Sequence, residues 1–357
     1  MRKTALIMAG GRGERFWPKS RVSLPKQFLS LTDDKQTMIQ LTVNRILPLV
    51  EMEDIYIVAN KIYKDLILQQ LPNIPAQNIL CEPAAKNTAP CIGLGAMYIS
   101  KKYDDATMFV LPSDHLIKNT DAFLNTLNNA CKLACAGPNL VTLGITPTYP
   151  ETGYGYIKYN LSSKYLTGYS VERFVEKPSI ELATQYLAER SYLWNSGMFV
   201  WNISTILNTM KQLIPDTYQN LLKIKSAIGT NYEAKTLHDT FIKCKSESID
   251  YAIMEHASNI FTIPGNFGWD DVGSWLALER HNVADTYNNI KRGNVISLDT
   301  HNCIIEGNQR LIATIGIENL IIVDTEDSLL ICSKDKCNNI KELLCEVTKD
   351  KALHDLL

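Results

Sequence analysis

The chain has 357 residues, of which 45% are hydrophobic and 21% charged, and these proportions are ordinary for a globular protein with a buried core. Its 36 basic and 38 acidic side chains leave a formal net charge of −2, which argues against nucleic acid or a membrane surface as a partner, because such partners attract a basic field. No apolar stretch approaches the roughly 20 residues that span a bilayer, and the nine cysteines show no paired CxxC spacing, so we expect a cytoplasmic protein with reduced thiols.

The first third of the chain alternates short β-branched or apolar runs with longer helical patterns. The predicted strands cover residues 4–9, 54–59, 79–81, 107–111 and 139–143. The predicted helices cover residues 38–47, 63–71, 89–101 and 122–134. This alternation predicts βαβ units, and therefore a mostly parallel sheet with helices on both faces and ligands at the carboxyl ends of its strands.

From about residue 154 the pattern changes. Runs of aromatic and β-branched residues predict antiparallel strands added to the sheet, followed by helices over residues 204–213 and 217–227. After about residue 285, short Val- and Ile-rich runs broken by Gly, Asn and Asp predict a small all-β unit that ends in a helix over residues 338–347. We therefore predict a large α/β domain over residues 1–285 and a small β-rich domain over residues 286–357.

A loop rich in glycines and cations follows the first predicted strand. Its backbone positions are Ala9, Gly10, Gly11 and Gly13, and its cations are Arg12, Arg15 and Lys26. Glycines let backbone N–H groups face a phosphate at close range, and the cations supply positive charge, so the pattern indicates a triphosphate site. A P-loop motif is absent, and the third glycine of the dinucleotide-binding fingerprint is missing. The alternative is a glycine turn with solvated arginines, which the added Pro-Lys-Gln segment disfavours.

The segment GGRGERFWPKSR, followed by LPKQF, resembles the signature loop of the sugar nucleotidyltransferases. Its Phe-Trp-Pro and Pro-Lys-Gln-Phe details are similar to those of the mannose-1-phosphate guanylyltransferase branch. Six further blocks follow in the family's order: EPAAKNTAP, LPSDH, ETGYGYI, FVEKP, WNSGMF and GWDDVGSW. Because these blocks cover most of residues 1–280, the chain is identified as a member of that family.

The resemblance implies a fold and a reaction. The fold is α/β, with a Rossmann-like, mostly parallel sheet and flanking helices of the glycosyltransferase-A-like type, followed by a small left-handed β-helix-like domain that ends in a helix. The reaction is transfer of GMP from GTP to mannose 1-phosphate, giving GDP-mannose and pyrophosphate, with Mg²⁺ assisting in-line attack on the α-phosphate. The attacking phosphate oxygen is already anionic near neutral pH, so no general base is needed, and the sequence shows no Ser-His-Asp triad.

The resemblance assigns the metal to two aspartates. Asp114 lies just past a predicted buried strand and Asp271 lies in a Gly- and Trp-rich loop, and a hard cation such as Mg²⁺ favours one or two carboxylates together with phosphate oxygens. A lone Asp after a strand is otherwise an N-cap or a turn residue, and we keep that interpretation for Asp270. We expect His115 to orient its loop, since no other His or Cys lies at metal-ligand spacing from it.

The resemblance also divides the substrate contacts among the residues. The catalytic cations are Arg15 and Lys26 on the triphosphate and Lys177 on the sugar phosphate. The nucleotide-binding residues are Ala9, Gly10, Gly11, Arg12, Gly13, Glu82, Pro83, Asn87, Thr88, Ser113 and Asp114, and the sugar-binding residues are Gly153, Gly155, Glu176 and Asn195. Glu82 is the candidate for base recognition, because a carboxylate can accept hydrogen bonds from the N1–H and the 2-amino group of guanine. Without the resemblance, Glu82 is an exposed acid before a proline turn, and Glu176 with Lys177 is a surface ion pair.

Three alternatives stay open. The first keeps the reaction and changes the sugar 1-phosphate or the nucleotide. The second is a non-catalytic regulatory homologue, which we would expect to lack one of the cations or metal-binding aspartates that are all present here. The third is a bifunctional enzyme with a fused isomerase domain, which we do not expect, because only about 70 residues follow the transferase. The expected partners are therefore GTP and mannose 1-phosphate, and the resemblance adds a homodimer built partly through the C-terminal domain.

Overall fold

The computed structural model describes residues 1–32 and 35–357 and divides the chain into two compact units, each assembled from separate segments. The first unit contains residues 1–10, 43–113 and 117–269, and the second contains residues 11–42, 114–116 and 270–357. The second unit therefore takes in most of the glycine-rich loop, both predicted metal-binding aspartates and the C-terminal strands. The sequence predicts two domains that meet at a single boundary near residue 285, and this boundary stays a prediction. The two compact units are defined differently, because each combines segments that are separate in the sequence.

A nine-stranded mixed sheet forms the centre of the first unit, in the order β3-β2-β1-β4-β9-β6-β10-β8-β7. Its strands are β1 (Arg2–Met8), β2 (Ile55–Asn60), β3 (Ile79–Glu82), β4 (Ala106–Pro112), β6 (Leu140–Ile145), β7 (Tyr156–Tyr165), β8 (Gly168–Val175), β9 (Tyr192–Asn202) and β10 (Ile260–Gly265). β1 pairs in parallel with β2 and β4, and β2 pairs in parallel with β3. β9 runs antiparallel to both β4 and β6. The predicted parallel half and the predicted antiparallel additions are both confirmed.

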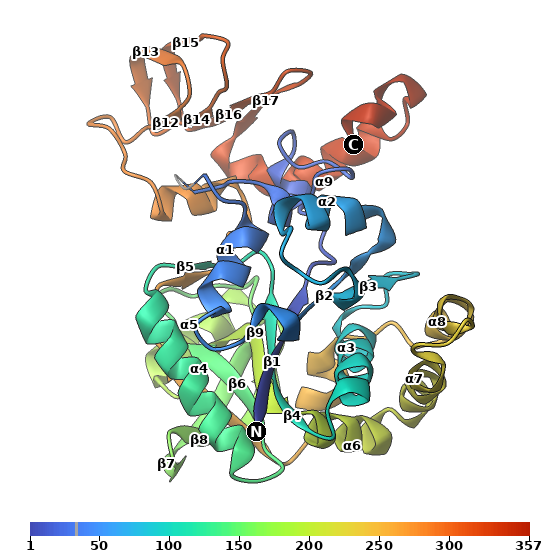
Figure 1. Ribbon diagram of the computed structural model, residues 1–357. Coiled ribbons are helices and arrows are strands. Elements are labelled where there is room, and N and C mark those ends of the chain that lie inside the picture. The colour runs from blue at the N-terminus through green and yellow to red at the C-terminus, as the bar shows by residue number, and fades with distance from the viewer. Residues whose placement is uncertain (33–34) are drawn as a thin grey trace. The chain divides into compact units, whose positions relative to one another are not determined.

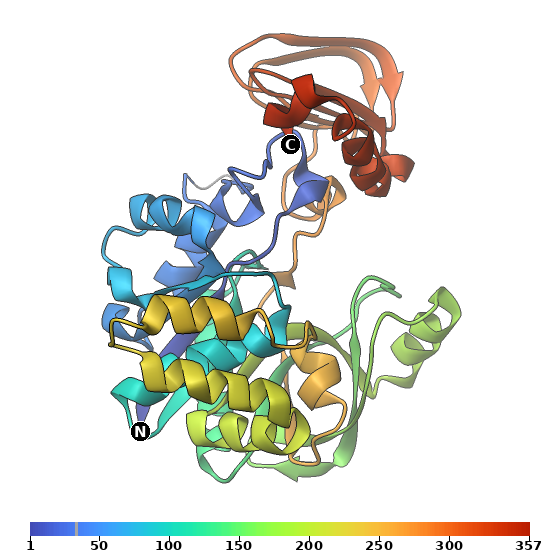
Figure 2. The same cartoon turned by 90° about the vertical axis from the view of Figure 1, so that its right-hand side faces the viewer.

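Helices cover both faces of this sheet (Figures 1 and 2). The α-helices are α2 (Lys64–Gln70), α3 (Thr88–Lys102), α4 (Thr120–Cys135), α5 (Ile180–Glu189), α6 (Ile203–Leu213), α7 (Pro215–Ala227) and α8 (Glu233–Phe241), and the shorter helices are η3 (Met52–Asp54), η4 (Lys61–Tyr63), η5 (Ala76–Asn78) and η6 (Asp250–Met254). α4 packs against β6, β9 and β10, whereas α3 packs against β1, β2, β3 and β4. α3 can approach β1 because Gly95 has no side chain, and a Cβ there would lie 2.4 Å from the side chain of Leu6.

Parallel strands stacked along the C-terminal segment form the core of the second unit. One sheet contains β12 (Ile290–Arg292), β14 (Ile304–Glu306), β16 (Leu320–Asp324) and the antiparallel β17 (Leu329–Ser333), and a second contains β13 (Val295–His301) and β15 (Ile312–Glu318). Ile290 pairs with Ile304, and Ile304 pairs with Ile321, so equivalent side chains stack in successive turns. This repeated parallel pairing is the β-helix-like arrangement that the resemblance implies, and the predicted helix follows it as α9 (Ile340–Val347).

Several short helices also belong to the second unit. The second unit contains the short helices η1 (Glu14–Phe16), η2 (Lys26–Phe28), η7 (Trp275–Arg280), η8 (Lys334–Asn339) and η9 (Lys351–Leu356). The helix α1 (Met38–Ile46) begins in the range of the second unit and ends in that of the first, and the strands β5 (Leu116–Ile117) and β11 (Trp269–Asp270) pair with each other.

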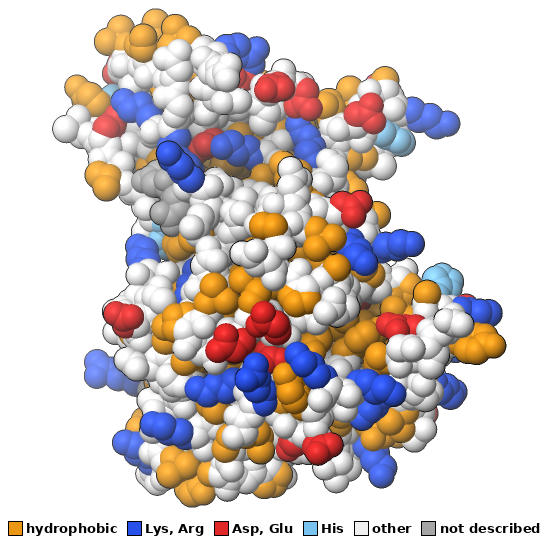
Figure 3. Space-filling view, in the orientation of Figure 1, with side chains coloured by type: hydrophobic (Ala, Val, Ile, Leu, Met, Phe, Trp, Pro, Cys, Tyr) orange, Lys and Arg blue, Asp and Glu red, His pale blue; other side chains and the backbone are white. Residues whose placement is uncertain are grey.

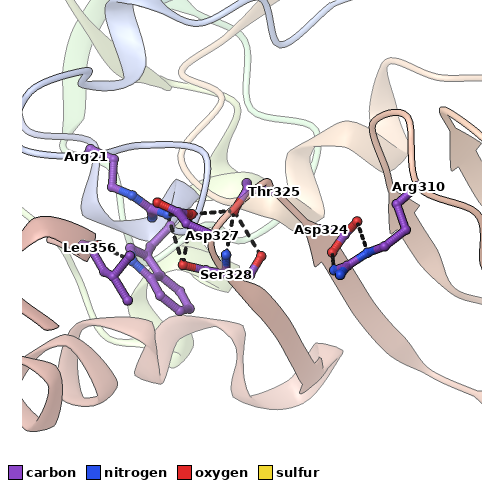
Figure 4. Close-up of polar contacts among 8 residues, drawn as sticks. Arg21, Arg310, Asp324, Thr325, Asp327, Ser328 and Leu356 are labelled. Carbon is purple, nitrogen blue, oxygen red and sulfur yellow. Dashed lines mark hydrogen bonds and ion pairs between the residues drawn. The ribbon is translucent and has the colours of Figure 1, made fainter.

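Within the second unit, polar contacts fasten the glycine-rich loop (residues 11–26) to the C-terminal segment. Trp17 Nε1 donates a hydrogen bond to the main-chain oxygen of Leu356 at 2.7 Å. Arg21 Nη2 donates to Asp327 Oδ1 at 2.7 Å, and Figure 4 shows this guanidinium reaching the turn between β16 and β17. The C-terminal segment therefore helps to fix the main chain of the loop.

Candidate active site

Gly13 gives the glycine-rich loop its tight bend. Its φ of +63° is in the left-handed region, and it begins the short helix η1. A Cβ at this position would lie 2.3 Å from Lys26 Cβ and 2.9 Å from the backbone nitrogen of Lys26. At Gly11, by contrast, a Cβ would meet nothing within 4 Å. The glycine at position 13 is therefore required by the close approach of Lys26, and Gly11 faces open space.

Lys26 joins the two predicted metal-binding aspartates. Its Nζ donates to Asp114 Oδ2 at 2.8 Å and to the main-chain oxygen of Asp271 at 2.5 Å, and the whole residue is only 5% exposed. Burial acts to raise the pKa of Asp114, but the charge of Lys26, followed by that of His115, lowers this pKa below its usual value. The structure therefore brings Lys26, Asp114 and Asp271 together, although nothing in the sequence indicates that Lys26 contacts both aspartates.

The two predicted arginines of the loop are exposed. Arg12 is 68% exposed at its side chain and has Glu14 as a distant partner, with 3.8 Å between Arg12 Nη1 and Glu14 Oε1. Arg15 follows in η1. The weakly paired guanidinium of Arg12 is free to reorient toward a phosphate.

Asp271 lies in a strained turn. The next residue, Val272, has a φ of +47°, which a β-branched residue adopts rarely and at a cost of about 1–3 kcal/mol. The N–H of Val272 donates to Asp270 Oδ1 at 2.7 Å, so Asp270 has the turn-capping role predicted for it. A Cβ on Gly273 would lie 2.8 Å from Asp271 Oδ2, which shows that the Asp271 carboxylate rests directly against the glycine main chain.

These residues fit a hard divalent cation. Both aspartates contact Lys26 Nζ, Asp114 through its carboxylate and Asp271 through its main-chain oxygen, and each carries a carboxylate. Mg²⁺ typically takes one or two carboxylates and completes its shell with water and phosphate oxygens. No group of three or more His, Cys, Asp or Glu side chains with metal-binding geometry occurs among residues 1–32 and 35–357. The donor set therefore suits a cation that arrives with a phosphate ligand better than one held by protein alone.

In the first unit, Glu82 is a buried acid with an unused acceptor. It ends β3, is 9% exposed, and within the described part of the chain its Oε1 has no hydrogen-bond partner. Burial raises the pKa of Glu82 to about 7, although a hydrogen bond with Cys91 acts to lower it. A Cβ on Gly10 would lie 4.0 Å from Glu82 Oε2, so Glu82 lies beside the residue that follows Ala9 at the end of β1. Glu82 is thus not the exposed acid of the alternative interpretation.

Three more predicted nucleotide-binding residues follow the carboxyl ends of neighbouring parallel strands. Ala9 and Gly10 come directly after β1, and Ser113 comes directly after β4. The N–H of Ser113 donates to the main-chain oxygen of Met8 at 3.1 Å, which joins the two strand ends. This is the edge at which open α/β sheets bind ligands.

The loop after β3 contains three further residues that were predicted to bind the nucleotide. Pro83 follows Glu82, and Asn87 has a φ of +65° and accepts a hydrogen bond from the N–H of Thr88 at 2.8 Å. Thr88 Oγ1 accepts from the N–H of Ile249 at 2.8 Å. The start of α3 is therefore tied to the segment that precedes η6.

The predicted sugar-binding residues also come together in the first unit. A Cβ on Gly155 would lie 2.7 Å from Glu176 Oε2 and 3.6 Å from Asn195 Cβ. The N–H of Asn195 donates to the main-chain oxygen of Gly155 at 2.8 Å. A side chain at position 155 would therefore displace the Glu176 carboxylate, and the sugar contact predicted for Gly155 stays a prediction.

Lys177 and Gly153 lie at the margin of this group. Lys177 has a φ of +41° and is 64% exposed at its side chain, and its Nζ lies 3.3 Å from Glu176 Oε1. The N–H of Gly153 donates to Glu151 Oε1 at 2.7 Å. The exposed ammonium of Lys177 is accessible to an anionic ligand.

Comparisons with known proteins identify the family of this chain. A family model described as nucleotidyl transferase matches residues 4–288, and one described as a MannoseP isomerase/GMP-like beta-helix domain matches residues 293–347. A mannose-1-phosphate guanylyltransferase from Salmonella montevideo is 38% identical over 349 residues, which are 96% of this chain and 73% of that protein. This chain belongs to the mannose-1-phosphate guanylyltransferase branch of the nucleotidyl transferase family.

Two solved structures resemble this nucleotidyl transferase over most of its length. One, described as mannose-1-phosphate geranyltransferase from Thermus thermophilus, is 31% identical with a TM-score of 0.88 and covers 98% of this chain and 100% of that chain. The other, described as mannose-6-phosphate isomerase from Helicobacter pylori, is 28% identical with a TM-score of 0.62 and covers 76% of this chain and 100% of that chain. Among the described residues, no helix has the length and apolar character needed to cross a membrane.

One residue near the sugar group of this nucleotidyl transferase escaped the sequence analysis. Asp250 opens η6, and its Oδ1 accepts a hydrogen bond from Asn195 Nδ2 at 2.7 Å. Burial raises the pKa of Asp250 to about 6. The hydrogen bond from Asn195 acts to lower this pKa, and the negative charge of Glu176 acts to raise it further. An acid inside the run Ile-Asp-Tyr-Ala-Ile-Met was a signal, since apolar runs seldom contain one without a function.

Proposed function

We propose that this nucleotidyl transferase transfers GMP from GTP to mannose 1-phosphate and so makes GDP-mannose and pyrophosphate. The names of its relatives support the sugar and the nucleotide. The single observation that carries the choice of GTP is the buried Glu82 carboxylate, whose Oε1 has no hydrogen-bond partner among the described residues and whose Oε2 would lie 4.0 Å from a Cβ on Gly10. Guanine has N1–H and 2-amino donors on one edge, and such an edge matches a carboxylate, whereas adenine, uracil and thymine lack that pair of donors.

The triphosphate contacts are proposed for the glycine-rich loop. Backbone N–H groups from Gly10 to Gly13, with Arg15 and Lys26, supply donors and positive charge for a ligand that carries several negative charges. Asp114 and Asp271 are proposed to hold Mg²⁺, whose charge would neutralise phosphate oxygens in the transition state. Lys26 stabilises this acidic pair through its contacts with both residues.

The sugar phosphate contacts are proposed for the group around Gly155. Glu176 and the Asn195 amide can hydrogen-bond to sugar hydroxyls, because one accepts and the other both donates and accepts. Asp250 orients the Asn195 amide by accepting from its Nδ2, and the amide oxygen accepts from the N–H of Gly197 at 3.1 Å, so one further hydrogen bond at each end of the amide is proposed for the sugar. Lys177 is proposed to neutralise the phosphate of the sugar.

The reaction needs positioning and charge neutralisation. An oxygen of the sugar phosphate attacks the α-phosphorus, a new P–O bond forms, and the bond to the bridging oxygen of the leaving pyrophosphate breaks. The nucleophile is already an anion, so no residue has to remove a proton. The protein residues bind both substrates, orient the attacking oxygen and stabilise charge on the pyrophosphate.

A substrate grid tests the proposal. Pyrophosphate release with Mg²⁺ is measured for GTP, ATP, UTP and dTTP against mannose, glucose and N-acetylglucosamine 1-phosphates, and isomerisation of mannose 6-phosphate is measured alongside. We expect one strong signal, at GTP with mannose 1-phosphate. Turnover at another combination would show that Glu82 or the sugar pocket is misassigned, and no turnover in any transfer reaction would favour the regulatory homologue.

Lys177 and Lys26 are expected to give different kinetic defects. Lys177→Ala should raise the KM for mannose 1-phosphate about tenfold or more and leave the KM for GTP within about twofold, because a lost charge-assisted contact weakens binding by about 1.5–3 kcal/mol. Lys26→Ala should chiefly raise the KM for GTP. Steady-state kinetics with each substrate varied in turn measures both. Exchanged phenotypes would show that the two cations are assigned to the wrong substrates.

We further propose a homodimer through β13 and β15. Their outer face carries Ile296, Leu298 and Ile315, which are 63%, 65% and 71% exposed, and Leu298 lies opposite Ile315 in the register. Figure 3 shows hydrophobic side chains gathered over these strands at the top of the view. Leu298→Lys should convert the dimer to a monomer in light scattering at micromolar concentration. A wild-type protein that is already monomeric would contradict this proposal.

A further inference from the structure

A cluster of polar side chains surrounds the buried carboxylate of Asp270, the residue before Asp271. Asp270 is 6% exposed, and Arg280 donates to its Oδ2 from Nε at 2.6 Å and to its Oδ1 from Nη2 at 3.0 Å. His281 Nε2 lies 2.9 Å from Asp270 Oδ2. Arg280 ends η7 and His281 follows it, and the two hydrogen bonds from Arg280 hold the Asp270 carboxylate in a single orientation, with the His281 ring beside it.

The Asp270 carboxylate in turn fixes the peptide that follows Asp271. Its Oδ1 accepts the N–H of Val272 at 2.7 Å, and Val272 has a φ of +47°. The Val272 side chain is 1% exposed in the core cluster that also contains Trp275. A β-branched residue persists in this conformation only where its surroundings over-determine it, and here a hydrogen bond and core packing both act on it.

We propose that Asp270, held by Arg280, is a positioning residue that maintains the left-handed turn at Val272 and so aims the Asp271 carboxylate at a divalent cation. The inference rests on the proposed function, because it takes Asp271 to be a metal ligand. Side chains that orient a metal ligand without touching the metal typically contribute about 10–100-fold to metal affinity. The two adjacent aspartates would then have different roles. The Asp270 carboxylate holds the protein turn, and the Asp271 carboxylate binds the cation.

The test is the metal affinity of Asp270→Asn. Asparagine keeps one oxygen for the Val272 N–H but loses the charge that holds Arg280. The half-saturating Mn²⁺ concentration is measured from water proton relaxation as Mn²⁺ is titrated into the GTP-loaded protein. We expect an increase of about tenfold. High Mg²⁺ should then restore most of kcat for pyrophosphate release, with the KM for mannose 1-phosphate unchanged.

The same unit offers a matched control. Asp324 is 2% exposed and is likewise gripped on both oxygens by an arginine, Arg310 (Figure 4). Asp324→Asn therefore removes the same kind of buried carboxylate at a place that the proposal does not connect with metal. Its midpoint of thermal unfolding should fall, as for Asp270→Asn, but its half-saturating Mn²⁺ concentration should equal that of wild type.

The outcomes separate the inference from the proposed function. A wild-type Mn²⁺ response in Asp270→Asn, or an equal loss in Asp324→Asn, overturns the positioning role. If Asp270→Asn does not fold, Arg280→Lys decides, because lysine keeps the charge and loses the two-point grip, and an unchanged Mn²⁺ response in it also overturns the role. If Asp271→Ala itself binds Mn²⁺ normally, the metal assignment of the proposed function fails instead.

Discussion

Asp271→Ala is expected to lower kcat for pyrophosphate release by about three orders of magnitude, or about 4 kcal/mol of transition-state stabilisation. The reason is that a bound cation stabilises developing phosphate charge by several kcal/mol, and the substitution removes a carboxylate proposed to hold it. The fold should persist, because Asp271 lies outside the buried hydrophobic core. Steady-state turnover over a range of Mg²⁺ concentrations, together with thermal unfolding, measures both effects.

An exposed aspartate of the same unit provides the control for this variant. Asp299 is 76% exposed at its side chain and lies on β13, so Asp299→Ala should keep wild-type kcat and Mg²⁺ dependence. Near-normal turnover of Asp271→Ala with unchanged Mg²⁺ dependence would contradict the metal assignment. A large fall in its unfolding midpoint would instead show that the residue supports the strained turn.

Glu82→Gln is expected to raise the KM for GTP about 10–100-fold, because a hydrogen-bonded charged acceptor contributes about 1.5–3 kcal/mol. The amide matches the carboxylate in size but offers one acceptor and one donor, and the donor would face the donors of guanine. The KM for mannose 1-phosphate should stay unchanged. Kinetics with GTP, ITP and ATP measures the change, because inosine lacks the 2-amino group. An unaltered preference among the three nucleotides would rule out Glu82 as the base-reading residue.

The raised pKa of Glu82 adds a pH dependence to the same contact. With a pKa of about 7, the carboxylate is mostly protonated at pH 6 and mostly ionised at pH 8. Only the ionised form accepts both hydrogen bonds, so the KM for GTP should fall about tenfold from pH 6 to pH 8. Glu82→Gln cannot titrate there and isolates this effect from ionisation of GTP itself. A wild-type profile parallel to that of Glu82→Gln would show that Glu82 does not titrate against the nucleotide.

Local sequence patterns predicted the strands and helices whose formation depends mainly on their own residues. β1, β2 and β4 are buried apolar strands, and α3 is an apolar helix, so periodicity and composition indicated them. The sequence analysis missed α5, although Ser179 caps it by accepting the N–H of Leu182 at 3.4 Å. α8 has no side-chain cap at Tyr232, so no start signal marks it. α5 therefore carried a start signal in the sequence, whereas α8 is recognised only from the structure.

The chemistry of the site was only partly visible in the sequence. The glycine-rich loop was predicted from its composition, but the close approach of Lys26 that explains Gly13 is seen only in the structure. Lys26 and Asp114 are 88 positions apart, and only the fold brings them to 2.8 Å. Asp250 was missed because its partner Asn195 is 55 positions away. The two compact units could not be predicted for the same reason. Their segments are joined by contacts between distant residues, and such contacts produce no periodic pattern in the sequence.

The central claim is that the GMP part of GTP passes to mannose 1-phosphate. Incubation with mannose 1-phosphate, Mg²⁺ and GTP labelled with ³²P at either the α or the γ position, followed by chromatography, tests it directly. The account predicts that α-label appears in a nucleotide sugar that co-migrates with GDP-mannose, and that γ-label appears only in pyrophosphate. Label from the γ position in a sugar phosphate, or no transfer of α-label to the sugar, would contradict it.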